Sequence, residues 1–318
     1  MMSTKLLDKA LDLSVVGGYT SIGYRIRSRD WQPLPRMDGK VVLITGATSG
    51  LGLAAAEAFA GLGATLWLAV RNRERGERAQ AQILERQADA EIHIALCDVS
   101  RIGAVRRFSE QFTAQAPRLD VLVNNAGVLT QERRLSDDGI ELTLATNVVG
   151  PFLLTQLLLP LLERSSPARI VNVSSGGMYT QKLHADDLQS ERGDFTGSKV
   201  YARSKRAEVV LTEMWAERLA GSGISVHAMH PGWADTPGIR TSLPRFQRVA
   251  RPLLRSPAEG ADTIVWLGAA PEPGMSSGGF WHDRARRPTH LLPGTRESDA
   301  ERRRLWAECV GLISMRSN

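Results

Sequence analysis

The stretch VVLITGATSGLG, residues 41–52, decides the fold of this chain. Its first five residues are apolar and mostly β-branched, which predicts a short strand buried on both faces. A glycine-rich turn follows, and residues 51–62 carry alanine, leucine and phenylalanine on one face of a predicted helix. A strand, a glycine-rich turn and a helix in direct succession are the setting of a dinucleotide site, because the helix N-terminus binds the pyrophosphate.

The turn itself, TGATSGLG from Thr45 to Gly52, has the spacing Gly-x3-Gly-x-Gly. Gly46 permits the tight turn, and Gly50 and Gly52 let the backbone and the helix approach the pyrophosphate. The residues predicted to hold the cofactor in this turn are Gly46, Thr48, Ser49, Gly50, Leu51 and Gly52.

Strand-like and helix-like segments alternate along the chain, which predicts βαβ units and a parallel sheet. The fold class we expect is α/β, a single Rossmann-type three-layer domain with a mostly parallel, about seven-stranded sheet. Strands are predicted over 41–45, 65–70, 92–99, 121–127, 169–175 and 224–232, and helices over 51–62, 74–87, 101–115, 139–164 and 197–220.

The end of the second strand, LAVRNRERGE, indicates which cofactor is bound. Folds that prefer NAD place an acid near this point for the ribose 2′-hydroxyl. This chain has Val70 and then Arg71, whose guanidinium can pair with a 2′-phosphate through two hydrogen bonds. NADP(H) is therefore favoured, with NAD(H) possible if Arg71 is only a solvated loop residue. Asp98, after the third strand, is either a partner of the adenine amino group or a loop cap.

The composition is that of a soluble globular protein, with 42% hydrophobic and 23% charged residues in a chain of 318. The only two cysteines, Cys97 and Cys309, exclude a disulfide framework and favour a reducing compartment. No apolar run reaches the roughly 18 residues of a membrane span, and no signal peptide is recognised at the N-terminus. We expect a cytoplasmic protein.

The net charge of +6 is concentrated in peripheral segments. Residues 1–40, 233–257 and 283–304 carry excesses of +3, +4 and +3 by count of Lys and Arg against Asp and Glu. This pattern is either solvated surface or attraction to an anionic substrate or membrane face. Nucleic acid is not expected as a partner, because no basic-aromatic recognition motif is present. The histidines and cysteines show no metal-ligand spacing, so we expect no metal.

The two ends lie outside the alternating pattern. Residues 1–36 are predicted to form an N-terminal arm, with Leu6, Leu7, Ala10, Leu11 and Val15 at helical spacing. The arm either packs on the domain or a dimer partner, or makes a peripheral membrane contact. The main domain is expected over 37–290. A C-terminal extension, 291–318, follows, in which a capping box from Ser298 to Glu301 predicts a short helix. That helix carries Leu305, Trp306, Cys309 and Leu312.

Within GSKVYARSKRAEVV, residues 197–210, Tyr201 and Lys205 are four positions apart and share one helix face. When hydride reaches a carbonyl carbon, the oxygen becomes an alkoxide that needs a proton. A free tyrosine has a pKa near ~10, and a nearby positive charge lowers that pKa. The two residues are either such an acid and its charged neighbour or two polar residues on a surface helix.

Seven motifs decide between these readings. TGATSGLG, Asp98-Val99, NNAG (124–127), Asn147 in NVVG, NVSS (172–175), YARSK (201–205) and PGWADT (231–236) occur in that order. Together they resemble the short-chain dehydrogenase/reductase superfamily, over roughly residues 38–285. The resemblance implies a catalytic tetrad of Asn147, Ser175, Tyr201 and Lys205.

In the tetrad that the resemblance implies, Tyr201 exchanges the proton, and Lys205 also contacts the nicotinamide ribose. Ser175 holds the substrate oxygen, although Ser174 is an alternative for that role. Asn147 interrupts its helix and positions a water. The resemblance further implies cofactor contacts from Val99, Asn125, Ala126, Gly127, Tyr201, Lys205, Pro231, Gly232 and Thr236. Asn124 and Asn125 are alternatively braces of the central sheet.

Two segments shape the expected substrate side. Ser175 and Tyr201 are 26 residues apart, and the interval contains the insertion KLHADDLQSERGDF, which we expect at the pocket rim. A substrate lid is expected over 233–257, where apolar residues stand among five arginines. An apolar floor with a basic rim suits a lipophilic carbonyl or alcohol, whereas the alternative is ordinary packing with solvated arginines.

The function predicted from these features is NADP(H)-dependent interconversion of a carbonyl and an alcohol, with Tyr201 as general acid and base. One alternative is an NAD-dependent alcohol dehydrogenase, and another is a protein that senses NADP(H) without turnover. A third is a membrane-peripheral scaffold. A small-molecule substrate and a homo-oligomer are expected as partners.

Overall fold

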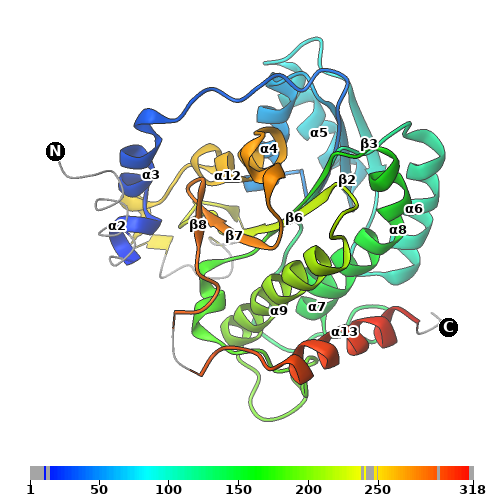
Figure 1. The fold of residues 1–318 in the computed structure, drawn as a ribbon, viewed down its shortest axis with the longest axis vertical. Coiled ribbons are helices and arrows are strands. Elements are labelled where there is room, and N and C mark those ends of the chain that lie inside the picture. Colours follow the sequence, from blue (N-terminus) through cyan, green and yellow to red (C-terminus); the bar gives the residue numbers. More distant parts are fainter. Residues whose placement is uncertain are drawn as a thin grey trace.

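The structure is a computed structural model that describes residues 11, 15–237, 240, 247–248, 250–291 and 294–314. Leu6, Leu7, Ala10 and much of the predicted lid lie outside these residues. Figure 1 shows one twisted sheet covered by helices on both faces. The sheet has eight strands in the order β3-β2-β1-β4-β5-β6-β7-β8. Their bounds are β1 Val41–Thr45, β2 Thr65–Val70, β3 Ile92–Leu96, β4 Val121–Asn124, β5 Ala168–Val173, β6 Ile224–Met229, β7 Gly279–His282 and β8 Ala285–Arg287.

The first seven strands are parallel, and β8 alone pairs antiparallel with β7. The predicted Rossmann-type α/β fold is thus confirmed, with one strand more than the approximate seven. Asp283 and Arg284 form the tight turn between β7 and β8, and both have positive φ. The polar sequence of β8, ARR, has no buried-strand pattern that would have revealed it.

The helices divide into two layers with separate apolar cores. Helices α4 (Gly50–Gly61), α5 (Arg73–Leu84) and α12 (Pro257–Ala269) cover one face, and α6 (Ile102–Gln115), α8 (Gly150–Arg164) and α9 (Gly197–Arg218) cover the other. All five residues of β1 are buried, because a central parallel strand meets a helix layer on each side. The sequence prediction omitted α12.

The predicted helix over 139–164 begins at Leu142 and changes form at its start. Helix α7 (Leu142–Leu144) passes into the π-helical turn η2 (Ala145–Val149) and then into α8. The stretch Leu142–Arg164 is long and apolar enough to cross a membrane, but 72% of its most apolar window is buried inside the domain. Phe152, Leu154 and Leu158 belong to the core between α8, α6 and α9. This segment is therefore accounted for as a core helix.

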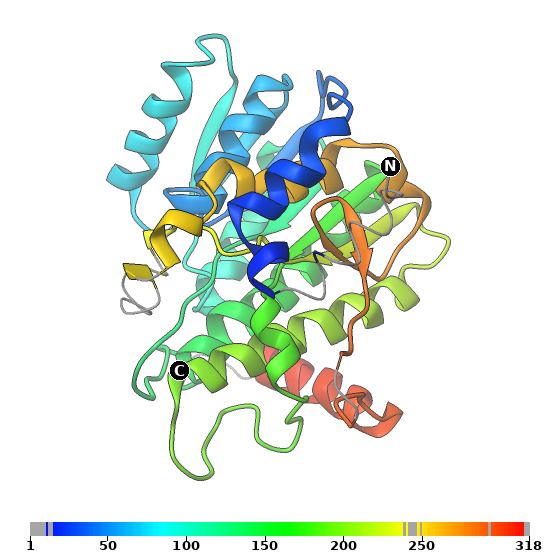
Figure 2. The same cartoon turned by 90° about the vertical axis from the view of Figure 1, so that its left-hand side faces the viewer.

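The N-terminal arm contributes α2 (Val15–Tyr19), α3 (Ser21–Arg27) and the 3₁₀ turn η1 (Ser28–Asp30). In Figure 2, α3 lies beside α12 and the β7–β8 hairpin. Arg284 connects these parts, because its guanidinium binds the Asp262 carboxylate of α12 and the Gln32 carbonyl, and stacks on Trp31.

The C-terminal helix α13 (Asp299–Ser314) follows the predicted capping box, in which Ser298 and Glu301 exchange side-chain and backbone hydrogen bonds. Its 16 residues make it longer than the short helix expected. Leu305, Cys309 and Leu312 are buried, and Figure 1 shows the helix lying along α9. Three further 3₁₀ turns complete the described elements: η3 (Gly176–Thr180), η4 (Arg251–Leu253) and η5 (Glu272–Met275).

Candidate active site

The predicted site residues lie where parallel strands end. Ala126, Ser175 and Pro231 follow β4, β5 and β6, and Gly46 follows β1. Carboxyl ends of parallel strands share one edge of a sheet, and ligands of open α/β sheets bind along that edge.

The glycine-rich turn is packed too closely to carry side chains. A Cβ on Gly46 would lie 2.9 Å from the Cα atom of Ala126, and Gly46 has φ of +69°. A Cβ on Gly52 would lie 2.5 Å from both the Gly46 carbonyl oxygen and the Asn125 side-chain nitrogen. The turn therefore leaves bare backbone before the N-terminus of α4, the arrangement that a pyrophosphate requires. A dinucleotide fits these residues.

Asn125 braces this turn. Its side-chain nitrogen donates to the Thr45 carbonyl at 2.8 Å, and its backbone N–H donates to the Thr45 hydroxyl at 3.0 Å. The Ala126 N–H donates to the same hydroxyl at 3.0 Å. Thr45 thus joins the ends of β1 and β4, a structural part that the sequence reasoning missed. Its place directly before Gly46 was the available signal.

Thr236 lies against the same turn, although it is 186 residues away from Gly50. A Cβ on Gly50 would lie 3.3 Å from Thr236 Cβ and Cγ2. The structure therefore brings the segment after β6 to the glycine-rich turn, as a shared cofactor site demands. Thr48, Ser49 and Leu51 belong to the same turn, and Ser49 is the N-cap residue of α4.

The end of β2 carries a basic residue and no acid. Arg71 is exposed directly after Val70, and the Asn72 side chain accepts a hydrogen bond from the Arg75 N–H at the start of α5. Asp98, after β3, accepts hydrogen bonds from the N–H and hydroxyl of Ser100 through one carboxylate oxygen. Val99 is buried, and its carbonyl contacts Gly150 at the start of α8.

Lys205 is the centre of the proposed catalytic group. Its Nζ lies 5.6 Å from the centroid of the Tyr201 ring and donates to the Val173 carbonyl at 2.9 Å. It also donates to the Glu208 carboxylate at 2.8 Å. Burial acts to lower the pKa of Lys205, but the opposite charge of Glu208 and the nearby Tyr201 raise it above its usual value. The ammonium form is therefore favoured in a dry site.

Asn147 lies in the π-helical turn, and π-turns often occur at functional sites. Its side-chain oxygen accepts from the Val128 N–H at 2.9 Å, and its nitrogen donates to the Val128 carbonyl and the Ser204 hydroxyl. A Cβ on Gly127 would lie 3.4 Å from Lys205 Nζ and 3.5 Å from Asn147 Oδ1. Gly127, Asn147 and Lys205 therefore come together from three separate segments.

The two serines after β5 have different surroundings. Ser174 is buried, and its hydroxyl donates to the Lys205 carbonyl at 2.9 Å. Ser175 is partly exposed, and its hydroxyl accepts from the Gly177 N–H at 3.1 Å. Gly177 in turn approaches Ala202, the neighbour of Tyr201. These contacts favour Ser175 for the substrate oxygen and give Ser174 a structural role.

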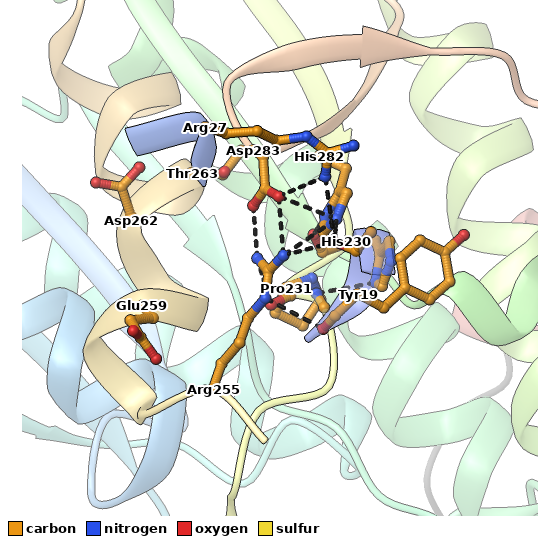
Figure 3. Close-up of polar contacts among 12 residues, drawn as sticks. Tyr19, Arg27, His230, Pro231, Arg255, Glu259, Asp262, Thr263, His282 and Asp283 are labelled. Atoms are coloured by element: carbon orange, nitrogen blue, oxygen red, sulfur yellow. Dashed lines mark hydrogen bonds and ion pairs between the residues drawn. The ribbon is translucent and has the colours of Figure 1, made fainter. Parts of the chain in front are cut away.

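A buried polar cluster holds the Pro231-Gly232 turn (Figure 3). Arg255 Nη2 binds Asp283 Oδ2 at 2.8 Å, and its guanidinium also donates to the Pro231 carbonyl. Gly232 has φ of +74°, and a Cβ on it would lie 2.4 Å from Arg255 Nε. Burial alone would raise the pKa of Asp283, but His282 and Arg255 hold it well below its usual range.

The N-terminal arm completes this cluster. Arg255 donates to the carbonyls of Gly18, Tyr19 and Thr20, and Arg27 binds Asp283 at 2.8 Å. The Tyr19 ring meets the His230 ring edge to face, with centroids 4.3 Å apart. Tyr19 also contacts Gly176, next to Ser175. The sequence reasoning missed the role of Arg255, which looks like any other lid arginine along the chain.

The substrate side is described in part. Leu183 and Ala185 of the insertion are buried in the core beside α9, and the Gln189 side chain accepts from the Glu141 N–H. Of the apolar residues of the predicted lid, Leu243, Phe246 and Val249 lie outside the described residues, whereas Leu254 is buried. Among the described residues, no group of three or more His, Cys, Asp or Glu could hold a metal ion.

The chain is similar to known proteins in sequence and in fold. The family model described as short chain dehydrogenase matches residues 40–245. Dehydrogenase/reductase SDR family member 12 of Bos taurus is 44% identical over 90% of this chain and 91% of its own length. Retinol dehydrogenase 14 of Homo sapiens is 36% identical over 85% of each chain. Among solved structures, the RhlG/NADP active-site complex of Pseudomonas aeruginosa has a TM-score of 0.65 at 25% identity, covering 79% of this chain and 96% of its own.

Proposed function

The chain belongs to the short-chain dehydrogenase family, and on that premise we propose that it interconverts a carbonyl and an alcohol with NADP(H). The observation that carries the proposal is the meeting of Lys205 with Tyr201, Asn147 and Gly127 beside the glycine-rich turn. A buried ammonium next to a tyrosine is what proton exchange with an alkoxide needs. A protein that only sensed the cofactor would have no use for this pair.

The proposed roles follow from the positions of the side chains. The bound cofactor supplies or accepts the hydride. Ser175 holds the substrate oxygen, and Tyr201 gives it a proton in reduction or removes that proton in oxidation. Lys205 keeps a positive charge beside Tyr201 and offers a donor to the nicotinamide ribose. Asn147 holds the Val128 backbone and Ser204 in place around this group.

We further propose a preference for NADP(H). The support is Arg71 at the end of β2, exposed where a 2′-phosphate would lie, with no carboxylate beside it at position 70 or 72. The same site would hold the rest of the cofactor through Gly46, Thr48, Ser49, Gly50, Leu51, Gly52, Asp98, Val99, Asn125, Ala126, Gly127, Pro231, Gly232 and Thr236.

The substrate class that we propose is a lipophilic carbonyl or alcohol. Trp233 and Tyr19, whose ring centroids are 6.3 Å apart, provide aromatic surface near Ser175. The similarity to a retinol dehydrogenase points to the same class.

We propose a cytoplasmic homo-oligomer, with peripheral membrane contact through residues 1–36. Salt-sensitive flotation with anionic liposomes would support this contact, and no flotation with or without residues 1–14 would remove it.

A carbonyl screen tests the catalytic proposal. Purified protein is mixed with NADPH or NADH and a series of aldehydes and ketones of increasing chain length, and nucleotide absorbance is followed. We expect turnover with NADPH. Tyr201→Phe should reduce this turnover at least about a hundredfold, since general acid catalysis contributes 10²–10⁴-fold. Equal turnover in the variant would remove Tyr201 from the mechanism. Tight NADPH binding without turnover of any compound would instead favour a sensor, and a preference for NADH would favour an NAD-dependent dehydrogenase.

A further inference from the structure

Glu208 is a buried acid that the proposed mechanism does not use. Its carboxylate lies 2.8 Å from Lys205 Nζ, with side-chain exposures of 8% and 3% for the two residues. One carboxylate oxygen bonds Lys205, and the other, Oε2, is buried, with the Ser174 side chain near the carboxylate. Burial of a carboxylate costs free energy unless an opposite charge compensates it. The Lys205–Glu208 pair is therefore an internal feature of α9 and not a chance contact on its surface.

We infer that Glu208 is a positioning residue that fixes Lys205 and sets the pH at which Tyr201 exchanges its proton. The inference rests on the proposed function and deepens it. Lys205 Nζ has three N–H bonds; Val173 and Glu208 accept two of them, at 2.9 and 2.8 Å. The remaining donor is then held in one direction, on the side where Gly127 and Tyr201 lie. Glu208 thereby orients the lysine.

The second effect of Glu208 is electrostatic. A negative charge beside Lys205 offsets the positive charge that would otherwise favour a phenolate at Tyr201. Burial raises the pKa of Glu208 to about 7, although Lys205 acts against this rise. Glu208 is therefore charged mainly above neutral pH, the range in which a tyrosine would act as a base. The site as a whole then holds one positive and one negative charge before Tyr201 ionises.

In the part of the chain that the structure describes, no further ionisable group acts on this pair. The ionisable groups that interact with Lys205 are Glu208 and Tyr201, and the one that interacts with Glu208 is Lys205. Of the segments packed against this pair, Val173 at the end of β5 accepts a hydrogen bond from Lys205 Nζ, and Ser174 after it donates to the Lys205 carbonyl. Three charged groups of the helix layer, Glu141, Arg206 and Arg302, have partners of their own. Glu141 caps α7, Arg206 binds Glu297 and His290 near α13, and Arg302 of α13 binds Glu213 and Glu217.

The test replaces the charge while keeping the shape. In Glu208→Gln, the Tyr201–Lys205 couple should lose its proton about one pH unit lower, because removal of a nearby negative charge makes loss of a proton easier. Below that midpoint, the rate of alcohol oxidation divided by its own plateau rate at high pH should then be about tenfold higher in the variant than in the unchanged protein. Glu208→Asp keeps the charge and should return the midpoint close to that of the unchanged protein. Glu213→Gln, which removes a carboxylate from the same helix, should leave the midpoint unchanged.

A readout that does not need turnover separates this inference from the proposed function. Phenolate absorbance is titrated in the cofactor-free protein, and the Tyr201→Phe curve is subtracted to isolate Tyr201. Tyr24 stays protonated throughout the titration, because burial raises its pKa well above the usual value. A lowered phenolate midpoint in Glu208→Gln, in a protein that turns over no tested compound, would refute the proposed function but support the role of Glu208. An unshifted midpoint in Glu208→Gln, or an equal shift in Glu208→Asp, would overturn the role. If Glu208→Gln does not fold, a wild-type midpoint in Glu208→Asp with lowered stability supports the role, and a shifted one refutes it.

Discussion

Arg255 and Asp283 form a buried ion pair that ties the end of the lid to the β7–β8 turn, and each side chain is only 1% exposed. The guanidinium also binds three carbonyls of the N-terminal arm. Three segments that are remote in sequence are thereby joined beside the Pro231-Gly232 turn. The nicotinamide end of the proposed site therefore depends on the arm as well as on the Rossmann domain.

Arg255→Met should destabilise the protein by about 3–5 kcal/mol, because it leaves the Asp283 carboxylate buried without its main partner. Chemical denaturation followed by circular dichroism measures this loss. Arg251→Met is the matched control, since Arg251 is exposed on η4 and its removal should change stability by less than about 0.5 kcal/mol. Equal effects of the two substitutions would show that the cluster contributes little.

Arg71→Glu should reverse the cofactor preference. The change replaces a cation that pairs with a 2′-phosphate by an anion that repels it and can accept from a ribose hydroxyl. We expect the ratio of kcat/KM for NADPH over NADH to fall at least about tenfold, the effect of one such charged contact. Arg73→Glu, two residues further on, should change the ratio little. A ratio untouched by Arg71→Glu would mean that Arg71 is a solvated loop residue.

Gly52→Ala should weaken cofactor binding by about tenfold or more. The new Cβ would lie 2.5 Å from the Gly46 carbonyl oxygen, so the turn must move away from the helix N-terminus. Isothermal titration with NADPH measures the Kd. Gly61→Ala serves as control on the same helix, because its Cβ would meet only the Gln87 side chain, at 3.4 Å. Retention of full affinity in Gly52→Ala would show that the turn tolerates the shift.

The contribution of His227 to the free energy of unfolding should fall as the pH drops below about 6.5. His227 Nδ1 accepts hydrogen bonds from the Gly279 N–H and Trp281 Nε1, so it must stay unprotonated, and burial lowers the pKa of this histidine. In the unfolded chain, this histidine binds a proton near pH 6.5, whereas in the folded state it binds a proton only at lower pH. Acid therefore favours unfolding.

The contribution of His227 can be isolated by substitution. Glu208 acts in the opposite direction between about pH 4.5 and 7, since its raised pKa makes the folded state hold the extra proton. In His227→Gln, the slope of unfolding free energy against pH should decrease by up to about 1.4 kcal/mol per unit below pH 6.5. Denaturation at several pH values provides the slope. Parallel curves for variant and unchanged protein would contradict the role of His227.

Local patterns were enough to predict the frame of the site. The apolar run of β1, its glycine-rich turn and the helix after it are determined by neighbouring residues, and so is the shared face of Tyr201 and Lys205 on α9. The resemblance to the short-chain dehydrogenase/reductase superfamily then assigned Asn147, Ser175 and Pro231 to one site. The sheet is mostly parallel, as predicted, and its strand order places β4, β5 and β6 side by side.

Glu208 and Arg255 could not be recognised in the same way, because a charged residue in a helix or loop is usually solvated. Helix α9 is buried on most of its faces, and within the described ranges Lys205 is the ionic partner of Glu208. Arg255 finds Asp283 only when β7 joins the sheet beside β6. The sequence by itself thus determined the fold and the Tyr201–Lys205 pair. Only the tertiary structure decided which further charges are buried, because desolvation arises from segments that are distant in the chain.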